Sequence, residues 1–241
     1  ASIHNITKFV KKSFAGPLLK KEINAINLVV QQKKEPVTCI IGGSKISTKI
    51  NVITSLMKKV NNLIIVGAMA NNFFIYKNLK IGKSLIEENT KEIIKTIYDK
   101  AKENKCKILI PEDCIVGTSF TSGGKSKDLD SVEDNDIILD IGPKTIKDIK
   151  NTIEHSSTVL WNGPAGYFEN DNFMLGTMSI AESISKNTVK KSLVSILGGG
   201  DTLAAVNKSK NKLSFTHLST AGGAFLEYLE GKDLPGLSVL K

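Results

Sequence analysis

The feature that most constrains this chain is the alternation of short apolar runs with longer amphipathic stretches. The runs are four or five residues long, and several are apolar at consecutive positions, as in strands that are buried on both faces of a parallel sheet. We expect strands at 37–41, 63–66, 107–110, 137–141, 158–161, 193–197 and 215–218.

The intervening stretches have the residue spacing of amphipathic helices. In 90–105, for example, Ile93, Ile97 and Ala101 share one face. We expect helices at 18–32, 46–60, 90–105, 143–155, 178–186 and 202–207, and a polar surface loop at 118–134. This alternation predicts an α/β fold with a doubly wound, mostly parallel, Rossmann-like sheet and helices on both faces.

Composition excludes several classes of protein. The chain has 241 residues, of which 41% are hydrophobic, so it can bury a core without disulfides. No run reaches the ~18 apolar residues of a membrane span, and the N-terminal stretch lacks the apolar segment of a signal peptide. The three cysteines form no C-x-x-C pair, which is typical of a reducing compartment. We therefore expect a cytoplasmic protein with no membrane partner.

The charge pattern argues against a nucleic-acid partner. The net charge is +9, but every basic residue is lysine, and the lysines are mixed with acidic residues along the chain. Arginine is the side chain best suited to bidentate recognition of phosphates and guanines, so we interpret these lysines as solvated helix faces. The three histidines lack metal-ligand spacing, and no G-x-S-x-G motif suggests a hydrolase triad.

The chemical signals are glycine-rich turns at the ends of expected strands, where open α/β sheets bind ligands. The first turn is Gly42-Gly43-Ser44-Lys45-Ile46-Ser47-Thr48-Lys49. Glycines allow close approach of the backbone to a ligand, and the following helix N-terminus attracts anions. We expect Lys45 and Lys49, four residues apart, on one face of that helix, where they would form a phosphate site. The alternative is a glycine turn with two solvated lysines.

The second turn is Gly198-Gly199-Gly200-Asp201-Thr202. Its glycines suit a phosphate group, whereas a carboxylate beside a bare phosphate is unfavourable. Asp201 fits such a site if it holds a Mg²⁺ ion that bridges to the phosphates. Alternatively, Asp201 is simply the N-cap of the following helix.

Two further turns follow expected strands. Trp161-Asn162-Gly163-Pro164 precedes Glu169 by a few residues, and Thr220-Ala221-Gly222-Gly223-Ala224 opens the last helix. By contrast, Gly123-Gly124-Lys125-Ser126 only imitates the end of a P-loop, because Ser119 stands where the Walker pattern requires glycine. We expect that segment to be part of the surface loop.

In this order and spacing, the four turns resemble those of the phosphoglycerate kinase family. The resemblance is to its C-terminal, nucleotide-binding half and connector helix, and it extends over nearly the whole chain, from residue 13 to residue 236. It implies a glycolytic kinase that transfers a phosphoryl group reversibly between ATP and 3-phosphoglycerate, giving 1,3-bisphosphoglycerate and ADP. It also implies Mg²⁺ as the cofactor.

The resemblance assigns roles at the phosphates. Lys45 resembles the lysine that neutralises the moving phosphoryl group, and Lys49 resembles the lysine that holds the nucleotide phosphates. Asp201 resembles the Mg²⁺ ligand. Gly222 and Gly223 would offer backbone N–H groups close to the transferred group. The residues that would line the phosphate path are Gly198, Gly199, Gly200 and Thr202.

It also assigns roles around the nucleoside. Gly67 and Leu139 would line the adenine slot, and Pro164 would press on the nucleoside. Asn162 resembles an asparagine near the terminal phosphate, and Glu169 resembles a glutamate that binds the ribose hydroxyls.

The sequence departs from the usual family residues at Ser44, Ala68, Ile138 and Ala221. Ala68 and Ile138 would lie in the adenine slot, at positions where the family commonly has glycine. Because their added methyl groups would narrow that slot, these two departures bear on nucleotide affinity and base selectivity more than on the phosphate chemistry.

The resemblance divides the chain into three segments. These are a connector with a long interdomain helix at 1–34, a nucleotide-binding α/β domain at 35–230, and a tail at 231–241 that would return to an N-terminal domain. In the family, that domain binds 3-phosphoglycerate through arginines and a histidine. This sequence starts after it and contains no arginine. We therefore expect a monomer that is inactive in isolation.

Three other functions remain open on the sequence alone. A fragment, split-gene product or decayed copy would bind nucleotide without turnover. A nucleic-acid binder would show a steep salt dependence of affinity. A Rossmann dehydrogenase would need a G-x-G-x-x-G motif after its first strand, and the sequence has none there.

Overall fold

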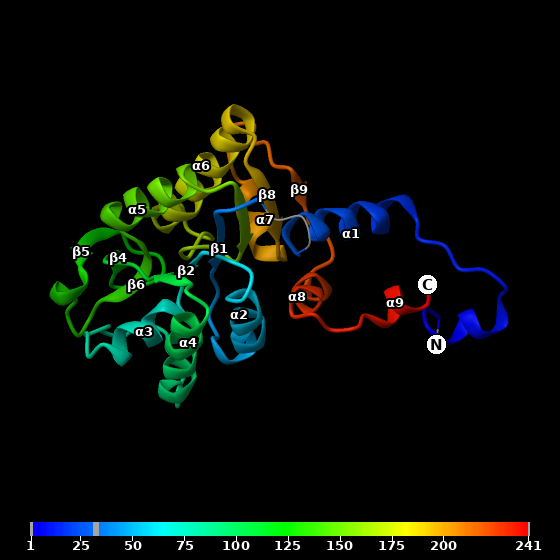
Figure 1. Ribbon diagram of the computed structural model, residues 1–241. Coiled ribbons are helices and arrows are strands. Elements are labelled where there is room, and N and C mark those ends of the chain that lie inside the picture. The colour runs from blue at the N-terminus through cyan, green and yellow to red at the C-terminus, as the bar shows by residue number, and fades with distance from the viewer. Residues whose placement is uncertain (1, 31–33, 241) are drawn as a thin grey trace.

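A six-stranded parallel sheet forms the centre of the computed structural model, which describes residues 2–30 and 34–240 (Figure 1). The strand order is β3-β2-β1-β7-β8-β9. The strands are β1 (Val37–Ile41), β2 (Asn62–Ile65), β3 (Lys107–Leu109), β7 (Thr158–Asn162), β8 (Val194–Gly198) and β9 (His217–Leu218). Six of the seven expected strands lie in this sheet, and the doubly wound α/β fold is confirmed.

Helices cover both faces of the sheet, because successive strand residues point to opposite sides. Cys39 and Ile41 belong to one apolar core, and Ile40 between them belongs to the other. The helices of the first core are α1 (Pro17–Val30), α2 (Ile50–Leu56), α3 (Ala70–Tyr76), α4 (Lys91–Glu103) and α8 (Gly223–Leu229). Those of the second are α5 (Pro143–Glu154), α6 (Leu175–Lys191) and α7 (Gly200–Asn207).

The strand order reverses between β1 and β7. One half of the sheet runs outward from β1 to β2 and β3, and the other runs from β7 to β8 and β9. Ile41 pairs with both Ile65 and Asn162, and Asn162 pairs with Gly198. The loops after β1, β2, β7 and β8 therefore leave the same edge of the sheet at the same level. This edge includes the switch point, where sheets of this kind bind ligands.

Strand β6 (Ile137–Ile141) corrects one prediction, because it lies outside the main sheet. It pairs antiparallel with β4 (Asp113–Gly117), which pairs antiparallel with β5 (Lys125–Asp128). Strand β5 occupies part of the stretch expected to be a surface loop, and its polar, mostly exposed residues give no apolar signal. Since Lys125 starts a strand rather than a helix, this segment is incompatible with a P-loop.

Some helix boundaries also differ from the predictions. The stretch 46–60 is a 3₁₀ turn at Ser47–Lys49 followed by α2, which ends at Leu56. Helix α6 is longer than expected because its buried face includes polar residues such as Thr177 and Ser183, which obscure the apolar period. Helix α1 starts one residue before its prediction, and residues 31 and 32 of that prediction lie outside the described residues.

The N-terminal and C-terminal segments lie together, away from the sheet (Figure 1). A 3₁₀ turn at Asn5–Phe9 and helix α9 (Pro235–Ser238) belong to this region. The N-terminal segment exposes large apolar side chains, namely Ile3, Ile6, Phe9, Val10, Phe14 and Leu18. Among the described helices, none combines the length and the apolar character that a bilayer crossing requires.

Candidate functional site

Backbone contacts join the loops that follow β1, β2 and β7. The amide of Gly42 donates to the carbonyl of Asn162 at 2.8 Å, and the amide of Gly67 donates to the carbonyl of Ala165 at 3.1 Å. Glycine is required for this approach, because a Cβ atom on Gly42 would lie 2.1 Å from the carbonyl oxygen of Pro164. The first and third glycine-rich turns therefore form one platform at the switch point.

Lys49 crosses this platform. Its Nζ donates to the carbonyl of Gly42 at 2.6 Å and to Oδ1 of Asn162 at 3.0 Å. Burial of the ammonium lowers the pKa of Lys49, while the nearby Cys39 and Asp201 side chains act in the opposite direction. The hydrogen bonds hold this cation between the first and third turns, within the electrostatic reach of Asp201.

Lys45 lies elsewhere, which corrects the expectation that both lysines share one helix face. Residues 45 and 46 precede the 3₁₀ turn, and the side chain of Lys45 is exposed. Glu87 lies beside this turn and accepts a hydrogen bond from the amide of Ser47 at 3.0 Å and another from its hydroxyl. The bonds from Ser47 lower the pKa of Glu87, and the charge of Lys45 adds a smaller effect in the same direction. Lys45 is therefore an exposed cation that is separate from the platform.

The second turn is tied to the third by a buried threonine. Thr202 is fully buried, and its Oγ1 accepts a hydrogen bond from the amide of Gly163 at 2.7 Å. Gly199, with φ +94°, is the N-cap of α7, and Asp201 lies exposed in the first turn of that helix. The alternative that Asp201 is the N-cap is therefore wrong.

The fourth turn lies beside the second but outside the platform. Gly222 has φ +57°, and Gly223 is the first residue of α8. The ring of Phe225 in α8 fills the space next to Gly198, since a Cβ atom on Gly198 would be 2.7 Å from that ring. Gly198 therefore allows close packing of α8 on the end of β8.

Helix α1 fixes the strand that leads into the fourth turn. Oε1 of Glu22 accepts a hydrogen bond from the amide of Thr220 at 2.8 Å, and Oε2 lies 3.0 Å from Nε2 of His217. Burial of Glu22 tends to raise its pKa, but the hydrogen bonds to His217 and Thr220 outweigh this and lower it. The end of β9 is thus anchored to a helix far away in the sequence.

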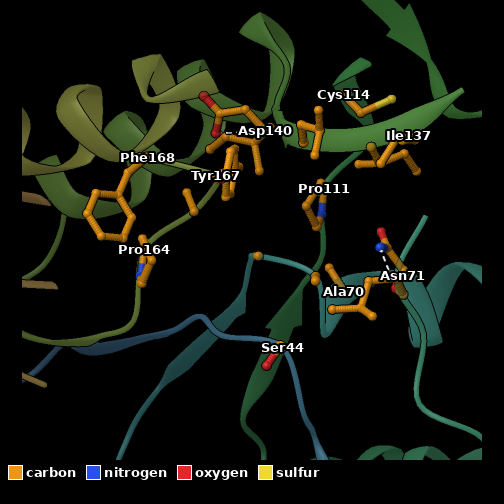
Figure 2. A pocket seen from close by; sticks show the side chains of 18 of the residues that line it. Ser44, Ala70, Asn71, Pro111, Cys114, Ile137, Asp140, Pro164, Tyr167 and Phe168 are labelled. Carbon is orange, nitrogen blue, oxygen red and sulfur yellow. Dashed lines mark hydrogen bonds between the residues drawn. The ribbon is translucent and has the colours of Figure 1, made fainter. Parts of the chain in front are cut away.

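A cavity of about 280 Å³ opens next to the platform, near the lower end of the ~300–1,000 Å³ range of small-molecule sites. The structure brings together five predicted site residues in its lining: Gly67, Leu139, Pro164, Glu169 and Asp201. Figure 2 shows further lining side chains, most of them apolar, including those of Ala70, Pro111, Ile137, Tyr167 and Phe168. Nine predicted residues do not line it, namely Lys45, Lys49, Asn162, Gly198, Gly199, Gly200, Thr202, Gly222 and Gly223.

The cavity wall contains three buried polar residues that the sequence motifs do not indicate, namely Asn71, Asp113 and Asp140. Asp140 accepts hydrogen bonds from the amides of Gly176 at 2.8 Å and Ile141 at 2.9 Å, and burial raises its pKa to about 7. Asn71, near the start of α3, is 1% exposed. The available sequence signals were a carboxylate inside the apolar run 137–141 and the pair Asn71-Asn72 inside an apolar stretch.

A larger cavity of about 730 Å³ lies against β3 and α5. Charged residues of both signs line it, and Lys144 and Asp128 form an ion pair at 2.7 Å in its wall. It lies against an edge strand of the sheet, away from the switch point, and none of the predicted site residues lines it. The smaller cavity is therefore the better candidate for a ligand site.

The residues of the smaller cavity fit a nucleotide that carries Mg²⁺. Gly67 and Leu139 belong to the wall that suits a base. Asp201 also lines the cavity, and Lys49, which lies outside the lining, is within electrostatic reach of Asp201. Within the described residues, no three His, Cys, Asp or Glu side chains gather into a metal site of their own. Asp201 would therefore hold Mg²⁺ together with ligand oxygens and water, which is the usual arrangement at phosphate sites.

Comparisons with known proteins give one consistent result. The family model described as phosphoglycerate kinase matches residues 1–232. The phosphoglycerate kinase of Wolbachia pipientis wMel is 43% identical over 243 aligned positions, covering 100% of this chain and 61% of the relative. That of Chelativorans sp. strain BNC1 is 42% identical over 231 positions, covering 95% of this chain and 58% of the relative.

Solved structures agree with the sequence matches. The structure of phosphoglycerate kinase from Coxiella burnetii has a TM-score of 0.92 at 38% identity and is matched over 99% of this chain and 61% of that one. The enzyme from Pyrococcus horikoshii OT3 has a TM-score of 0.79 at 26% identity, with 99% and 60% covered. The chain therefore spans about three fifths of the length of the relatives that it matches.

Proposed function

The chain belongs to the phosphoglycerate kinase family, and we propose that it carries the nucleotide-binding half of such an enzyme. The reaction would be the reversible transfer of a phosphoryl group between ATP and 3-phosphoglycerate. The observation that carries the proposal is the position of Lys49 and Asp201 beside an apolar cavity at the switch point of the sheet.

The cavity suggests how the nucleotide would lie. The base would occupy the wall of Gly67 and Leu139, and the ribose would face the exposed carboxylate of Glu169. The phosphates would then extend toward Lys49 and the N-terminus of α7, whose amides and dipole favour anions.

The proposed chemistry requires no general base. The carboxylate of 3-phosphoglycerate is already ionised at neutral pH, so catalysis consists of positioning and neutralisation of charge on the moving group. Bound Mg²⁺ would neutralise charge on the phosphate oxygens. Lys49 would hold the phosphates, exposed Lys45 would approach the moving group, and the amides of Gly222 and Gly223 would face that group from the fourth turn.

We propose that the acid substrate binds to a different domain. The chain contains no arginine with which to bind it. The exposed apolar side chains of the N-terminal segment favour contact with another folded unit. In this proposal 1–34 is the connector, 35–230 is the nucleotide domain and 231–241 returns to the other domain, so the isolated chain would be catalytically incomplete.

The substitution Asp201→Ala is expected to abolish the Mg²⁺ dependence of ADP binding. In the unaltered chain, Mg²⁺ should strengthen ADP binding, because the ion would link the phosphates to the ionised carboxylate of Asp201. Since Asp201 is exposed and contributes only a favourable charge at the N-terminus of α7, the variant should stay folded and unfold at most about 4 °C lower. The measurement is calorimetric titration of ADP with and without Mg²⁺.

The matched control is Asp148→Ala, which removes another exposed carboxylate, in the wall of the larger cavity. This control should keep the full Mg²⁺ effect. An ADP affinity that is indifferent to Mg²⁺ in the unaltered chain would show that the metal role of Asp201 is wrong.

A further inference from the structure

We propose that Asn71 recognises the 6-amino group of a purine base, so that the cavity selects adenine nucleotides over 6-oxo purine nucleotides. This inference rests on the proposed nucleotide function and adds a residue that determines base specificity.

Only one of the two polar atoms in the side-chain amide of Asn71 has a hydrogen-bond partner among the described residues. Its Nδ2 donates to the carbonyl of Leu85 at 2.9 Å, whereas its buried Oδ1 has no hydrogen-bond partner among the described residues. Asn71 lines the cavity together with apolar residues such as Pro111 and Ile137. In Figure 2 the dashed bond leaves from the nitrogen, and the oxygen lies on the side of Ile137.

The orientation of the amide is fixed by its surroundings. Exchange of the nitrogen and oxygen of Asn71 would place two acceptors, Oδ1 and the carbonyl of Leu85, against each other. The carbonyl of Leu85 therefore fixes the nitrogen of Asn71 on its own side and leaves Oδ1 of Asn71 on the side of the cavity. A buried carbonyl oxygen without a donor is unfavourable, and a water molecule in this apolar wall would lack the two to four polar partners that it needs.

A purine with an amino group at C6 supplies the missing donor. Its ring is flat and apolar enough for the wall around Asn71, and its exocyclic N–H can bond to Oδ1. A 6-oxo purine presents a carbonyl oxygen at the same position, so that two acceptors would face each other. Because Oδ1 is buried in the free protein, the neighbouring side chains have to move slightly as the base enters.

The test compares three nucleotides on the unaltered chain in the presence of Mg²⁺: ADP, inosine diphosphate and purine riboside diphosphate, which lacks any 6-substituent. Calorimetry should show inosine diphosphate binding about tenfold more weakly than ADP, and the unsubstituted analogue several-fold more weakly. Equal affinities for all three would overturn this inference alone. Failure of all three to bind would overturn the proposed function and this inference with it.

Two leucine variants test whether Asn71 causes the preference for ADP over inosine diphosphate. Asn71→Leu should reduce the preference for ADP over inosine diphosphate to within about twofold, mainly by weakening ADP. The matched control is Asn72→Leu, because Asn72 is equally buried on the same helix but does not line the cavity. Its Oδ1 accepts from the amide of Glu87 at 3.1 Å, and its unpartnered atom in the described structure is the donor Nδ2.

The control should keep the full preference for ADP. An equal loss of preference in both variants would overturn the inference, because it would trace the effect to the packing of α3. If Asn71→Leu fails to fold, the nucleotide series on the unaltered chain still decides the question.

Discussion

Alone, the 241-residue chain is expected to bind Mg-ADP but to transfer phosphoryl groups to 3-phosphoglycerate at least about 10⁵-fold more slowly than the same chain joined to the N-terminal domain of a relative. Transfer requires both substrates to be held in line at near-contact distance, and such positioning contributes ~7–11 kcal/mol. The chain has the proposed phosphate platform around Lys49 but no arginine for the acid. Any residual reaction should release phosphate to water.

A coupled assay with ATP, Mg²⁺ and 3-phosphoglycerate measures this difference. ADP affinity, measured in parallel, should be similar in the two proteins, so that the loss is assigned to transfer and not to nucleotide binding. Comparable turnover by the isolated chain would mean that its lysines form an acid site, and the proposed division of labour would be wrong.

Gly42→Ala is expected to destabilise the fold by about 3 kcal/mol or more and to eliminate nucleotide binding. The new methyl group would lie 2.1 Å from the carbonyl oxygen of Pro164, far inside van der Waals contact. The loop of Pro164 cannot easily retreat, because Gly163 donates to Thr202 at 2.7 Å and Ala165 donates to Thr177 at 2.9 Å. Thermal unfolding should shift downward by roughly 6–12 °C.

Gly123→Ala provides the comparison for this variant. A Cβ atom on Gly123 would have no atom within 4 Å, so the same chemical change should leave both the unfolding temperature and ADP binding unaltered. If Gly42→Ala behaved like Gly123→Ala, the tight approach of the β1 and β7 loops would not hold in solution.

The main sheet was predictable because its four inner strands, β1, β2, β7 and β8, are almost entirely buried. Residues 37–41 are all buried, and the expected bounds of β1 are those observed. The small sheet was not predictable in the same way. Strand β5 is short, polar and mostly exposed, and β6 has the same apolar character as the strands of the main sheet. An apolar run shows that a strand is buried but does not show which sheet it joins.

The sequence indicated which turns form the candidate site, but it did not indicate how the side chains of these turns are oriented. The glycines were predicted to let the backbone approach a ligand, whereas the structure shows that Gly42 and Gly67 let the loops approach one another. The directions of Lys45 and Lys49 were not predictable, because the helix starts later than the apolar period indicates. The orphaned oxygen of Asn71 depends on the loop at Leu85, so no local sequence pattern reveals it.

The most direct test of nucleotide binding at the switch point is a titration of the isotope-labelled chain with Mg-ADP, followed by backbone amide NMR. The expected result is that the largest shifts fall on residues 42–49, 67–71, 162–164 and 198–202, with little change around the larger cavity at 107–112 and 144–152. Shifts centred on the larger cavity, or no shifts at millimolar Mg-ADP, would contradict a nucleotide site at the carboxyl ends of β1, β2, β7 and β8.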